Sequence, residues 1–259
     1  MMPLNRRQFL SLAVTGAAAM GYESMSPVYG TGKSKIKAIL FDAFPVFDSR
    51  PVFILAEHLF PGRGAELSNV WRTKQFEYQW LHALSGRYVD FWQATEDSLV
   101  YAARLLKLEL TPHKRKYLMD AYLSLKAWPD APAALETLRS EGLRLAILSN
   151  ATPKILDAGI KNSSLEGKFE HVISTDKIKT YKPDPRAYQM AIDAFGLTKE
   201  EFLFAAFAGW DAAGAKSFGY TTYWVNRLNL PQEELGVTPD AAGKDLSDLV
   251  AFVKALRQV

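Results

Sequence analysis

The sequence predicts an α/β protein, with a doubly wound, Rossmann-like parallel-sheet core and an inserted helical cap domain. Short apolar runs recur along the chain, and each is followed by polar or turn-forming residues, as buried strands are; they cover residues 36–41, 143–148, 202–207 and 222–225. Helical patterns separate the later runs, which is the alternation expected of a parallel sheet. A long stretch, residues 49–128, lacks strand-like alternation and interrupts this rhythm.

The core elements follow in order along the chain. The first run predicts a buried strand that stops at Asp42. Helices are expected over residues 131–140, 153–160, 185–195 and 212–218, with a further short strand at 171–174 and an amphipathic helix at 245–256. Right-handed crossovers place such helices on the two faces of one parallel sheet. The carboxyl ends of the strands are where a doubly wound sheet binds its ligands, so reactive groups are expected there.

The interrupting stretch predicts a small helical cap made of three or four helices. Its first long helix, residues 67–84, carries an aromatic-rich apolar stripe at helical spacing, and residues 90–106 and 112–125 repeat the pattern. Trp128-Pro129 marks the return of the chain to the core. The expected organisation is therefore a core of residues 31–48 and 129–259 with a cap of residues 49–128.

Composition excludes several classes of protein. With 259 residues, 48% hydrophobic and 23% charged, the chain is long and apolar enough for an ordinary globular core. The net charge of +3 comes from interspersed charges of both signs, so no nucleic-acid partner is expected. The absence of cysteine excludes disulfides, thiol nucleophiles and cysteine zinc sites, and the four histidines lack ligand spacing.

Residues 1–30 are expected to be an export signal peptide rather than part of the fold. Asn5-Arg6-Arg7-Gln8-Phe9-Leu10 puts an arginine pair before a weakly apolar run. At about 12 residues this run is shorter than the roughly 20 that a membrane-spanning helix needs. The pattern resembles a twin-arginine signal, which implies the twin-arginine export machinery as a partner and a periplasmic location. If these residues are instead an ordinary N-terminus, the location is cytoplasmic.

Four strand-end or loop positions carry groups able to do chemistry: Asp42, the pair Ser149-Asn150, Lys182 and Asp211. A carboxylate at a strand end can act as a nucleophile that forms an ester intermediate. A nearby lysine would keep it ionised, and a second aspartate could activate water. Each residue alone also has an ordinary structural role, because aspartates cap helices and Ser-Asn pairs form turns.

The ordered set of motifs resembles the haloacid dehalogenase superfamily, and within it the L-2-haloacid dehalogenases of type II. The resemblance covers residues 35–240. It rests on Phe41-Asp42-Ala43-Phe44, Leu148-Ser149-Asn150, Tyr181-Lys182-Pro183-Asp184, Gly209-Trp210-Asp211 and Trp224-Val225-Asn226-Arg227, with a cap between the first two that includes Trp71-Arg72-Thr73-Lys74 and Arg87-Tyr88-Val89-Asp90-Phe91.

This resemblance implies hydrolysis of (S)-2-haloalkanoic acids to (R)-2-hydroxy acids. Asp42 would displace the halide from the α-carbon and form an ester, with Lys182 supporting it and Asp211 activating water. The resemblance gives the halide to Arg72 and the Asn150 side chain, with Phe91 as an apolar wall. Ser149 and the backbone amides beside Asn150 and Phe44 would hold the substrate carboxylate, and Trp210 would shape the pocket. It implies no cofactor and a homodimer.

Two positions set the chain apart from the phosphatases of the same superfamily. Phe44 stands where those enzymes carry a second aspartate, and Phe207 stands where they carry a further metal carboxylate. Asp42 and Asp211 alone are a sparse ligand set for Mg²⁺, so no required metal is expected.

The chain also departs from the dehalogenase pattern. Pro45 and Val46 replace the family's Gly-Thr, and Ala206 and Ala208 replace its serine and asparagine. Polar groups are therefore missing beside the nucleophile and the hydrolytic water. Besides a working dehalogenase, two other readings remain open: a catalytically impaired dehalogenase-like protein that binds small carboxylic acids, and a phosphatase.

Overall fold

The computed structural model describes residues 35–258, which lie within one compact unit, Lys33–Val259. The expected export signal lies outside the described residues. Within the described part of the chain, no helix is long and apolar enough to cross a membrane.

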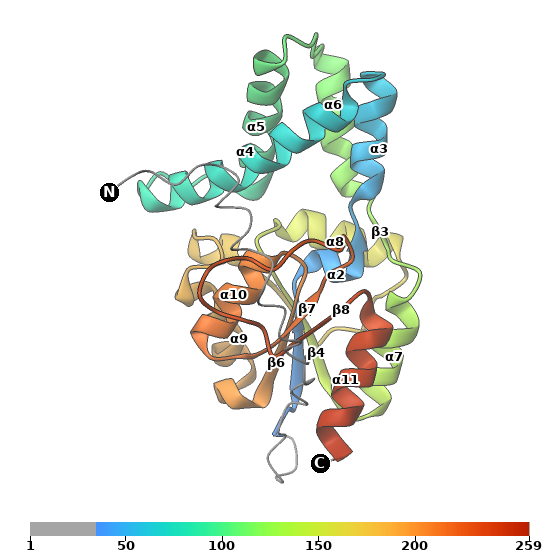
Figure 1. The fold of residues 1–259 in the computed structure, drawn as a ribbon, viewed down its shortest axis with the longest axis vertical. Coiled ribbons are helices and arrows are strands. Elements are labelled where there is room, and N and C mark those ends of the chain that lie inside the picture. Colours follow the sequence, from blue (N-terminus) through green and yellow to red (C-terminus); the bar gives the residue numbers. More distant parts are fainter. Residues whose placement is uncertain (1–34, 259) are drawn as a thin grey trace, which may run out of the picture. The chain divides into compact units, whose positions relative to one another are not determined.

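A six-stranded parallel sheet forms the centre of the core (Figure 1). Its strands are β1 (Ala38–Phe41), β4 (Arg144–Ser149), β5 (His171–Ser174), β6 (Phe202–Ala206), β7 (Thr221–Val225) and β8 (Ala241–Gly243), in the order β5-β4-β1-β6-β7-β8. The chain runs outward from β1 to β5 and then returns to the other side of β1. The order therefore reverses beside β1, which is where a doubly wound sheet opens its ligand crevice.

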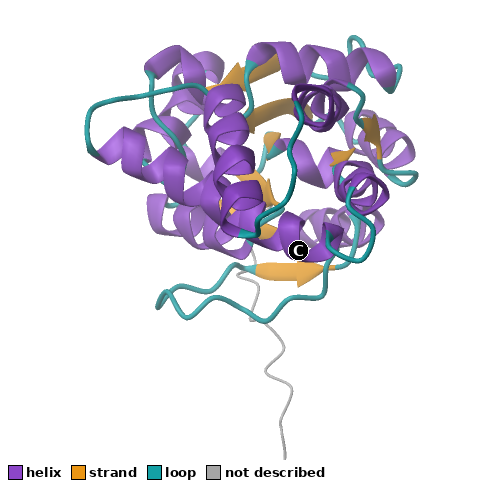
Figure 2. Cartoon of the chain, turned by 90° about the horizontal axis from the view of Figure 1, so that it is seen from above, coloured by secondary structure: helices purple, strands orange, loops and turns teal. Residues whose placement is uncertain are grey.

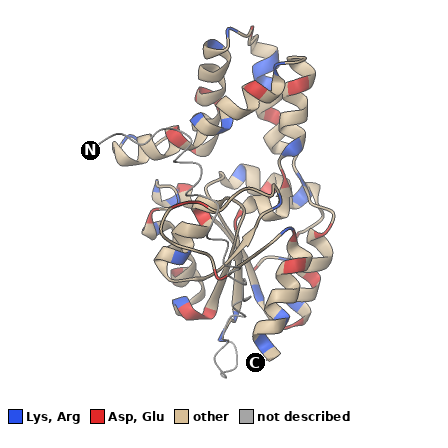
Figure 3. Ribbon diagram, in the orientation of Figure 1, with Lys and Arg blue, Asp and Glu red and all other residues tan. Residues whose placement is uncertain are grey.

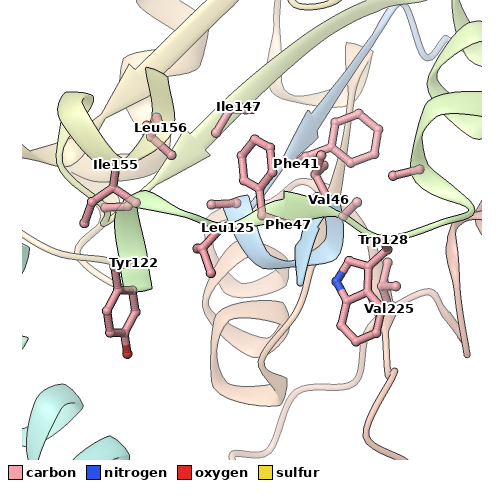
Figure 4. Packing of buried hydrophobic residues seen from close by; sticks show 14 of the residues in the cluster. Phe41, Val46, Phe47, Tyr122, Leu125, Trp128, Ile147, Ile155, Leu156 and Val225 are labelled. Atoms are coloured by element: carbon pink, nitrogen blue, oxygen red, sulfur yellow. The ribbon is translucent and has the colours of Figure 1, made fainter. Parts of the chain in front are cut away.

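Helices cover the two faces of this sheet (Figure 2). They are α7 (Ala131–Ser140), α8 (Pro153–Asn162), α9 (Pro185–Phe195), α10 (Gly209–Phe218) and α11 (Leu246–Gln258). Successive strand residues point to opposite faces, so Ile39 and Phe41 join one buried cluster while Ala38 and Leu40 join the other. Figure 4 shows Phe41, Ile147 and Leu156 among the side chains of the first cluster. The α/β fold predicted from the apolar runs is confirmed.

The interrupting stretch folds into helices, as its pattern predicts. These are α3 (Arg50–Leu59), α4 (Gly64–Leu84), α5 (Phe91–Leu105) and α6 (Pro112–Asp120), followed by the 3₁₀ turn η1 (Ala121–Leu123). Antiparallel strands β2 (Phe47–Asp48) and β3 (Lys126–Ala127) pair where the chain enters and leaves these helices. The division into core and cap at residues 48/49 and 128/129 stays a prediction, since residues 33–259 form one compact unit.

Short elements are the ones that the sequence does not predict. The turn after β1 is the single-turn helix α2 (Ala43–Val46), in a segment that looked irregular because it contains Pro45. The ribbon of β2 and β3 and the edge strand β8 have two or three residues each, too few for periodicity to show.

Charged residues of both signs are interspersed over core and cap (Figure 3).

Candidate active site

Asp42 lies at the carboxyl end of β1, beside the point where the strand order reverses. It caps α2, and its Oδ2 accepts a hydrogen bond from the backbone N–H of Phe44 at 3.2 Å. Its Oδ1 accepts hydrogen bonds from the Ser149 hydroxyl at 3.3 Å and from the Lys182 ammonium at 2.9 Å. The side chain keeps 11% exposure, so the carboxylate is held from several sides without being fully buried.

Lys182 connects the two aspartates of the site. Its Nζ donates to Asp42 Oδ1 at 2.9 Å, to Asp211 Oδ2 at 2.5 Å and to the Leu148 carbonyl at 3.2 Å. These acceptors match the three hydrogens of an ammonium group. Burial alone would lower the pKa of Lys182, but the charges of Asp211 and Asp42 outweigh it and raise that pKa. Lys182 is therefore a permanent buried cation between two carboxyl groups.

Asp211 lies in the first turn of α10 and is buried. Its Oδ1 accepts a hydrogen bond from the Tyr188 hydroxyl at 2.8 Å. Burial raises the pKa of Asp211 to about 6; the Asp42 charge adds to that rise, while Lys182 and Tyr188 oppose it. A carboxyl group with such a pKa can take a proton from water near neutral pH.

Asn150 follows β4 and joins the site to the cap. Its Oδ1 accepts hydrogen bonds from the Lys182 backbone N–H at 2.9 Å and from the Thr175 hydroxyl at 3.3 Å. Its Nδ2 donates to Oε1 of Gln79, on the cap helix α4, at 3.3 Å. The next residue of α4, Trp80, donates from Nε1 to the Lys182 carbonyl at 3.1 Å. Consecutive residues of one cap helix thus bond to two site residues of the core.

A largely apolar pocket of about 210 Å³ lies between the cap helices and the loops that follow β6 and β7. Arg72 of α4 lines it, and within residues 35–258 this guanidinium has no carboxylate partner; it faces the Phe53 ring at 5.2 Å. Burial lowers the pKa of Arg72, although an arginine stays protonated. The lining residues are Phe44, Ser49, Phe53, Arg72, Gln75, Phe76, Tyr122, Phe207, Ala208, Gly209, Trp210, Asn226, Leu228, Leu230 and Glu233. An unpaired guanidinium in an apolar pocket is suited to an anionic ligand.

The family model described as haloacid dehalogenase-like hydrolase matches residues 36–219. This chain belongs to that family. The hydrolase is 45% identical over 206 residues to an (S)-2-haloacid dehalogenase of Pseudomonas sp. strain YL, covering 79% of this chain and 89% of that relative. It is 42% identical over 207 residues to haloacetate dehalogenase H-2 of Moraxella sp. strain B, covering 80% of this chain and 92% of that relative.

Solved structures agree with this assignment. An L-2-haloacid dehalogenase with 43% identity has a TM-score of 0.83, covering 85% of this chain and 99% of its own. The L-2-haloacid dehalogenase of Xanthobacter autotrophicus with chloropropionic acid covalently bound is 36% identical and has a TM-score of 0.77, covering 85% of this chain and 98% of its own. The hydrolase therefore shares its fold with haloacid dehalogenases over 85% of the chain.

The structure brings most of the predicted site residues together. Asp42, Ser149, Asn150, Lys182 and Asp211 form one hydrogen-bonded group. Phe44, Arg72 and Trp210 line the adjoining pocket, where the Trp210 ring contacts those of Phe76 and Trp80 at 5.4 Å.

Three placements differ from the sequence-based expectations. Phe91 is absent from the pocket lining; it is buried behind Tyr122, whose ring it contacts at 6.0 Å, because its position at the start of α5 turns it into the cap interior. The Phe44 N–H, expected to hold a substrate carboxylate, donates to Asp42. The N–H of Ala151, beside Asn150, donates to the Ser149 hydroxyl at 3.2 Å, so both amides already have acceptors.

Tyr188 is the site residue that sequence reasoning missed. It lies on α9, six residues after Lys182, and is fully buried. Burial raises the pKa of Tyr188 well above its ordinary value, so its hydroxyl stays protonated and donates to Asp211. A tyrosine on the buried face of a helix has the same periodicity as a packing residue, so the pattern gives no sign of its role.

The positions that depart from the dehalogenase pattern lie in the segment that follows β1 and at the end of β6. Val46 and Ala206 are fully buried, and Ala208 precedes α10 and lines the pocket. The Ala208 carbonyl accepts a hydrogen bond from the Asp211 backbone N–H at 3.1 Å. Within residues 35–258, no group of three or more His, Asp or Glu side chains is placed to hold a metal ion. Metal independence stays a prediction.

Ester hydrolysis by this hydrolase is expected to slow as the pH falls through about 6. Asp211 must be ionised to take a proton from water, and the pKa of that carboxyl is raised to about 6 by burial. When Asp42 is esterified, its negative charge no longer raises the pKa of Asp211. The inflection of the hydrolysis rate against pH should therefore lie at or below about pH 6. The decay of trapped ester, followed by mass spectrometry from pH 4.5 to 8, measures it. A decay rate that is constant over this range would show that Asp211 is not the base.

Proposed function

We propose that the chain is a hydrolytic dehalogenase that converts (S)-2-haloalkanoic acids to (R)-2-hydroxy acids through an ester at Asp42. One observation carries the proposal: a strand-end carboxylate bonded to a buried lysine lies two residues before Phe44, which lines an apolar pocket together with Arg72, a guanidinium without a carboxylate partner within residues 35–258. This combination suits a substrate with a carboxylate, a leaving anion and a small apolar group. The names of the relatives support the same substrate class.

In the first step, a carboxylate oxygen of Asp42 attacks the α-carbon. The new C–O bond forms as the carbon–halogen bond breaks, and the electron pair leaves with the halide. Donors aimed at the departing halide stabilise the negative charge that develops on it. The resemblance assigns this part to Arg72 and the Asn150 side chain, and their free guanidinium and amide hydrogens suit it.

In the second step, water hydrolyses the ester. Asp211 takes a proton from the water as the water oxygen attacks Cγ of Asp42, the carbonyl carbon of the ester. The bond between Cγ and the ester oxygen then breaks, and the departing alkoxide takes the proton from Asp211. The new carboxyl group of Asp42 releases its remaining proton. The hydroxy acid leaves, and Asp42 is restored as a carboxylate. The net reaction consumes one water and releases one halide and one proton. Lys182 is expected to hold the carboxyl groups in place throughout, because its ammonium contacts both aspartates.

Product configuration tests this function. Attack from the side opposite the halogen inverts the α-carbon, so (S)-2-bromopropionate should give (R)-2-hydroxypropionate, and (R)-2-bromopropionate should not react. Chiral chromatography of the product distinguishes the outcomes. Retention of configuration would contradict a direct displacement by Asp42, and equal turnover of both enantiomers would contradict the selectivity for (S)-2-haloalkanoic acids.

A second candidate is a protein that is alkylated at Asp42 but hydrolyses its ester slowly. Ala206 and Ala208 favour it, because they carry methyl groups at positions where the dehalogenase pattern has polar side chains that could orient water. The Tyr188 hydroxyl favours the working enzyme, since it orients Asp211 without help from those positions.

The double variant Ala206→Ser with Ala208→Asn is expected to shorten the lifetime of the ester about tenfold, the equivalent of one hydrogen bond to water in the transition state. Rapid quenching and mass spectrometry measure that lifetime. Ala134→Ser adds a hydroxyl to a buried alanine of α7 and serves as the control for a general effect on the core. An unchanged lifetime in the double variant would mean that other groups hold the water.

We also propose that the protein is exported to the periplasm by the twin-arginine machinery and that it forms a homodimer. The Arg6-Arg7 pair before an apolar run supports export, and the absence of cysteine suits an oxidising compartment. Fractionation of cells that express the wild type or the Arg6→Lys, Arg7→Lys variant tests export. Light scattering of the purified protein tests the dimer.

A further inference from the structure

Gln79 is a buried residue of the cap. Neither the sequence analysis nor the proposed reaction assigns it a role. Its side chain is 0% exposed, and it accepts from Asn150 Nδ2 through Oε1 at 3.3 Å. Its Nε2 is buried and has no hydrogen-bond partner within residues 35–258. An amide that leaves donors unsatisfied in the interior destabilises the fold relative to an apolar side chain of the same size. Gln79 is therefore poorly explained as a stabilising residue.

The orientation of this amide is fixed by its neighbours. The backbone N–H of Lys182 can only donate, so the Asn150 atom that it contacts at 2.9 Å must be the oxygen. Thr175 donates to the same oxygen. The Asn150 nitrogen therefore faces Gln79, and Gln79 must present its oxygen in return. One Asn150 N–H is used in this bond, which leaves the other for a ligand.

Gln79 also lies on the helix that carries Arg72. The two residues are seven positions apart on α4, which is two turns of one helix face. Asn150 and Arg72 are the residues to which the resemblance assigns the leaving halide, and they come from different parts of the chain. Gln79 joins them, because it shares a helix with Arg72 and a hydrogen bond with Asn150.

We infer that Gln79 is a positioning residue that aligns Asn150 with Arg72 around the departing halide. This inference rests on the proposed dehalogenase function. The hydrogen bond between Gln79 and Asn150 fixes where α4 lies against the end of β4. It thereby fixes where the Arg72 guanidinium lies relative to the Asn150 amide. The unsatisfied Nε2 is the stability cost of this alignment.

The Gln79→Met variant tests the inference, because methionine keeps the volume and removes the amide. Its melting temperature should equal or exceed that of the wild type. The rate of the first halide release should fall about tenfold with (S)-2-chloropropionate, the rate equivalent of one hydrogen bond. The loss should be smaller with (S)-2-bromopropionate, because bromide is the better leaving group and depends less on hydrogen-bond donors.

Trp80→Phe is the matched control. It removes the neighbouring cap-to-core hydrogen bond, from Nε1 to the Lys182 carbonyl, but not a bond to a halide donor. It should slow the chloride and bromide substrates by the same factor. In the Asn150→Ala background, Gln79→Met should have no further effect on the chloride-to-bromide ratio, because the residue through which Gln79 acts has gone.

The outcomes separate this inference from the proposed function. A lower melting temperature together with equal losses for both substrates would make Gln79 a structural residue and overturn the inference. If the wild type releases no halide at all, the proposed function fails. The inference is then judged by chloride and bromide binding, measured by calorimetry at constant ionic strength. Halide binding that is equal in the wild type and in Gln79→Met would overturn the inference. Halide binding that is weaker in Gln79→Met but not in Trp80→Phe would support it.

Discussion

Asp42→Asn is expected to release no halide above background from (S)-2-bromopropionate while it keeps the wild-type fold. An amide is too weak a nucleophile to displace halide, so the rate should fall at least about 10⁴-fold, as it does when an enzyme loses its nucleophile. The asparagine oxygen can take the place of Oδ1 and accept from Lys182; the amide nitrogen then faces the Phe44 N–H, so one hydrogen bond at the start of α2 is lost while the ion contact site keeps its shape. A halide electrode measures the rate, and the melting temperature reports the fold.

The control for this variant is Asp193→Asn, which neutralises an exposed aspartate on α9 and should retain wild-type activity. Mass spectrometry must show that residue 42 has not deamidated back to aspartate. Wild-type activity in a verified Asp42→Asn protein would remove the covalent mechanism and with it the proposed role of the strand-end carboxylate.

Lys182→Met is expected to abolish activity and to lower the free energy of unfolding by about 3–5 kcal/mol, the usual effect of breaking a buried ion pair. Its ammonium is 1% exposed and contacts Asp42 and Asp211, so its loss leaves two carboxylates close together without a cation. Urea unfolding at pH 7.5 measures the loss.

Two further measurements show whether charge is the cause. The destabilisation should be smaller at pH 5 than at pH 7.5, because Asp211, whose pKa burial raises to about 6, is then protonated and no longer needs the cation. The double variant Lys182→Met, Asp211→Asn should recover part of the stability, since one uncompensated carboxylate is removed. If Lys182→Met were as stable as the wild type at pH 7.5, the ammonium would not be holding the two aspartates together.

The strands of the core and the positions of the site could be predicted from the sequence because both leave local signals. Parallel strands that are buried on both faces are continuous apolar runs in the sequence. The polar residue that follows such a run must therefore lie at the carboxyl end of its strand, on the side of the sheet where ligands bind. Asp42 and Ser149 follow directly from this rule, since each ends or directly follows its strand. The strand-end or loop positions of Lys182 and Asp211 also mark them as candidate reactive groups, and the resemblance assigns each of them a role.

Contacts between distant segments could not be predicted in the same way. Tyr188 and Gln79 lie on buried helix faces, where a polar side chain and a packing side chain occupy the same positions in the pattern. Phe91 was expected in the pocket wall, but whether the first residue of a helix faces a pocket or the helix interior depends on how the neighbouring helix packs. The pairing of β2 with β3 joins residues that are far apart in sequence, which no local pattern records.

The number of halide ions released per protein molecule tests the central claim most directly. The full-length wild type is incubated with (S)-2-bromopropionate without added metal, and the mass of the peptide that contains Asp42 is followed in parallel. Many equivalents of bromide, with a transient ester on Asp42, are the expected result. One equivalent with a permanent ester would contradict hydrolysis, and no bromide from a folded protein would contradict the dehalogenase function itself.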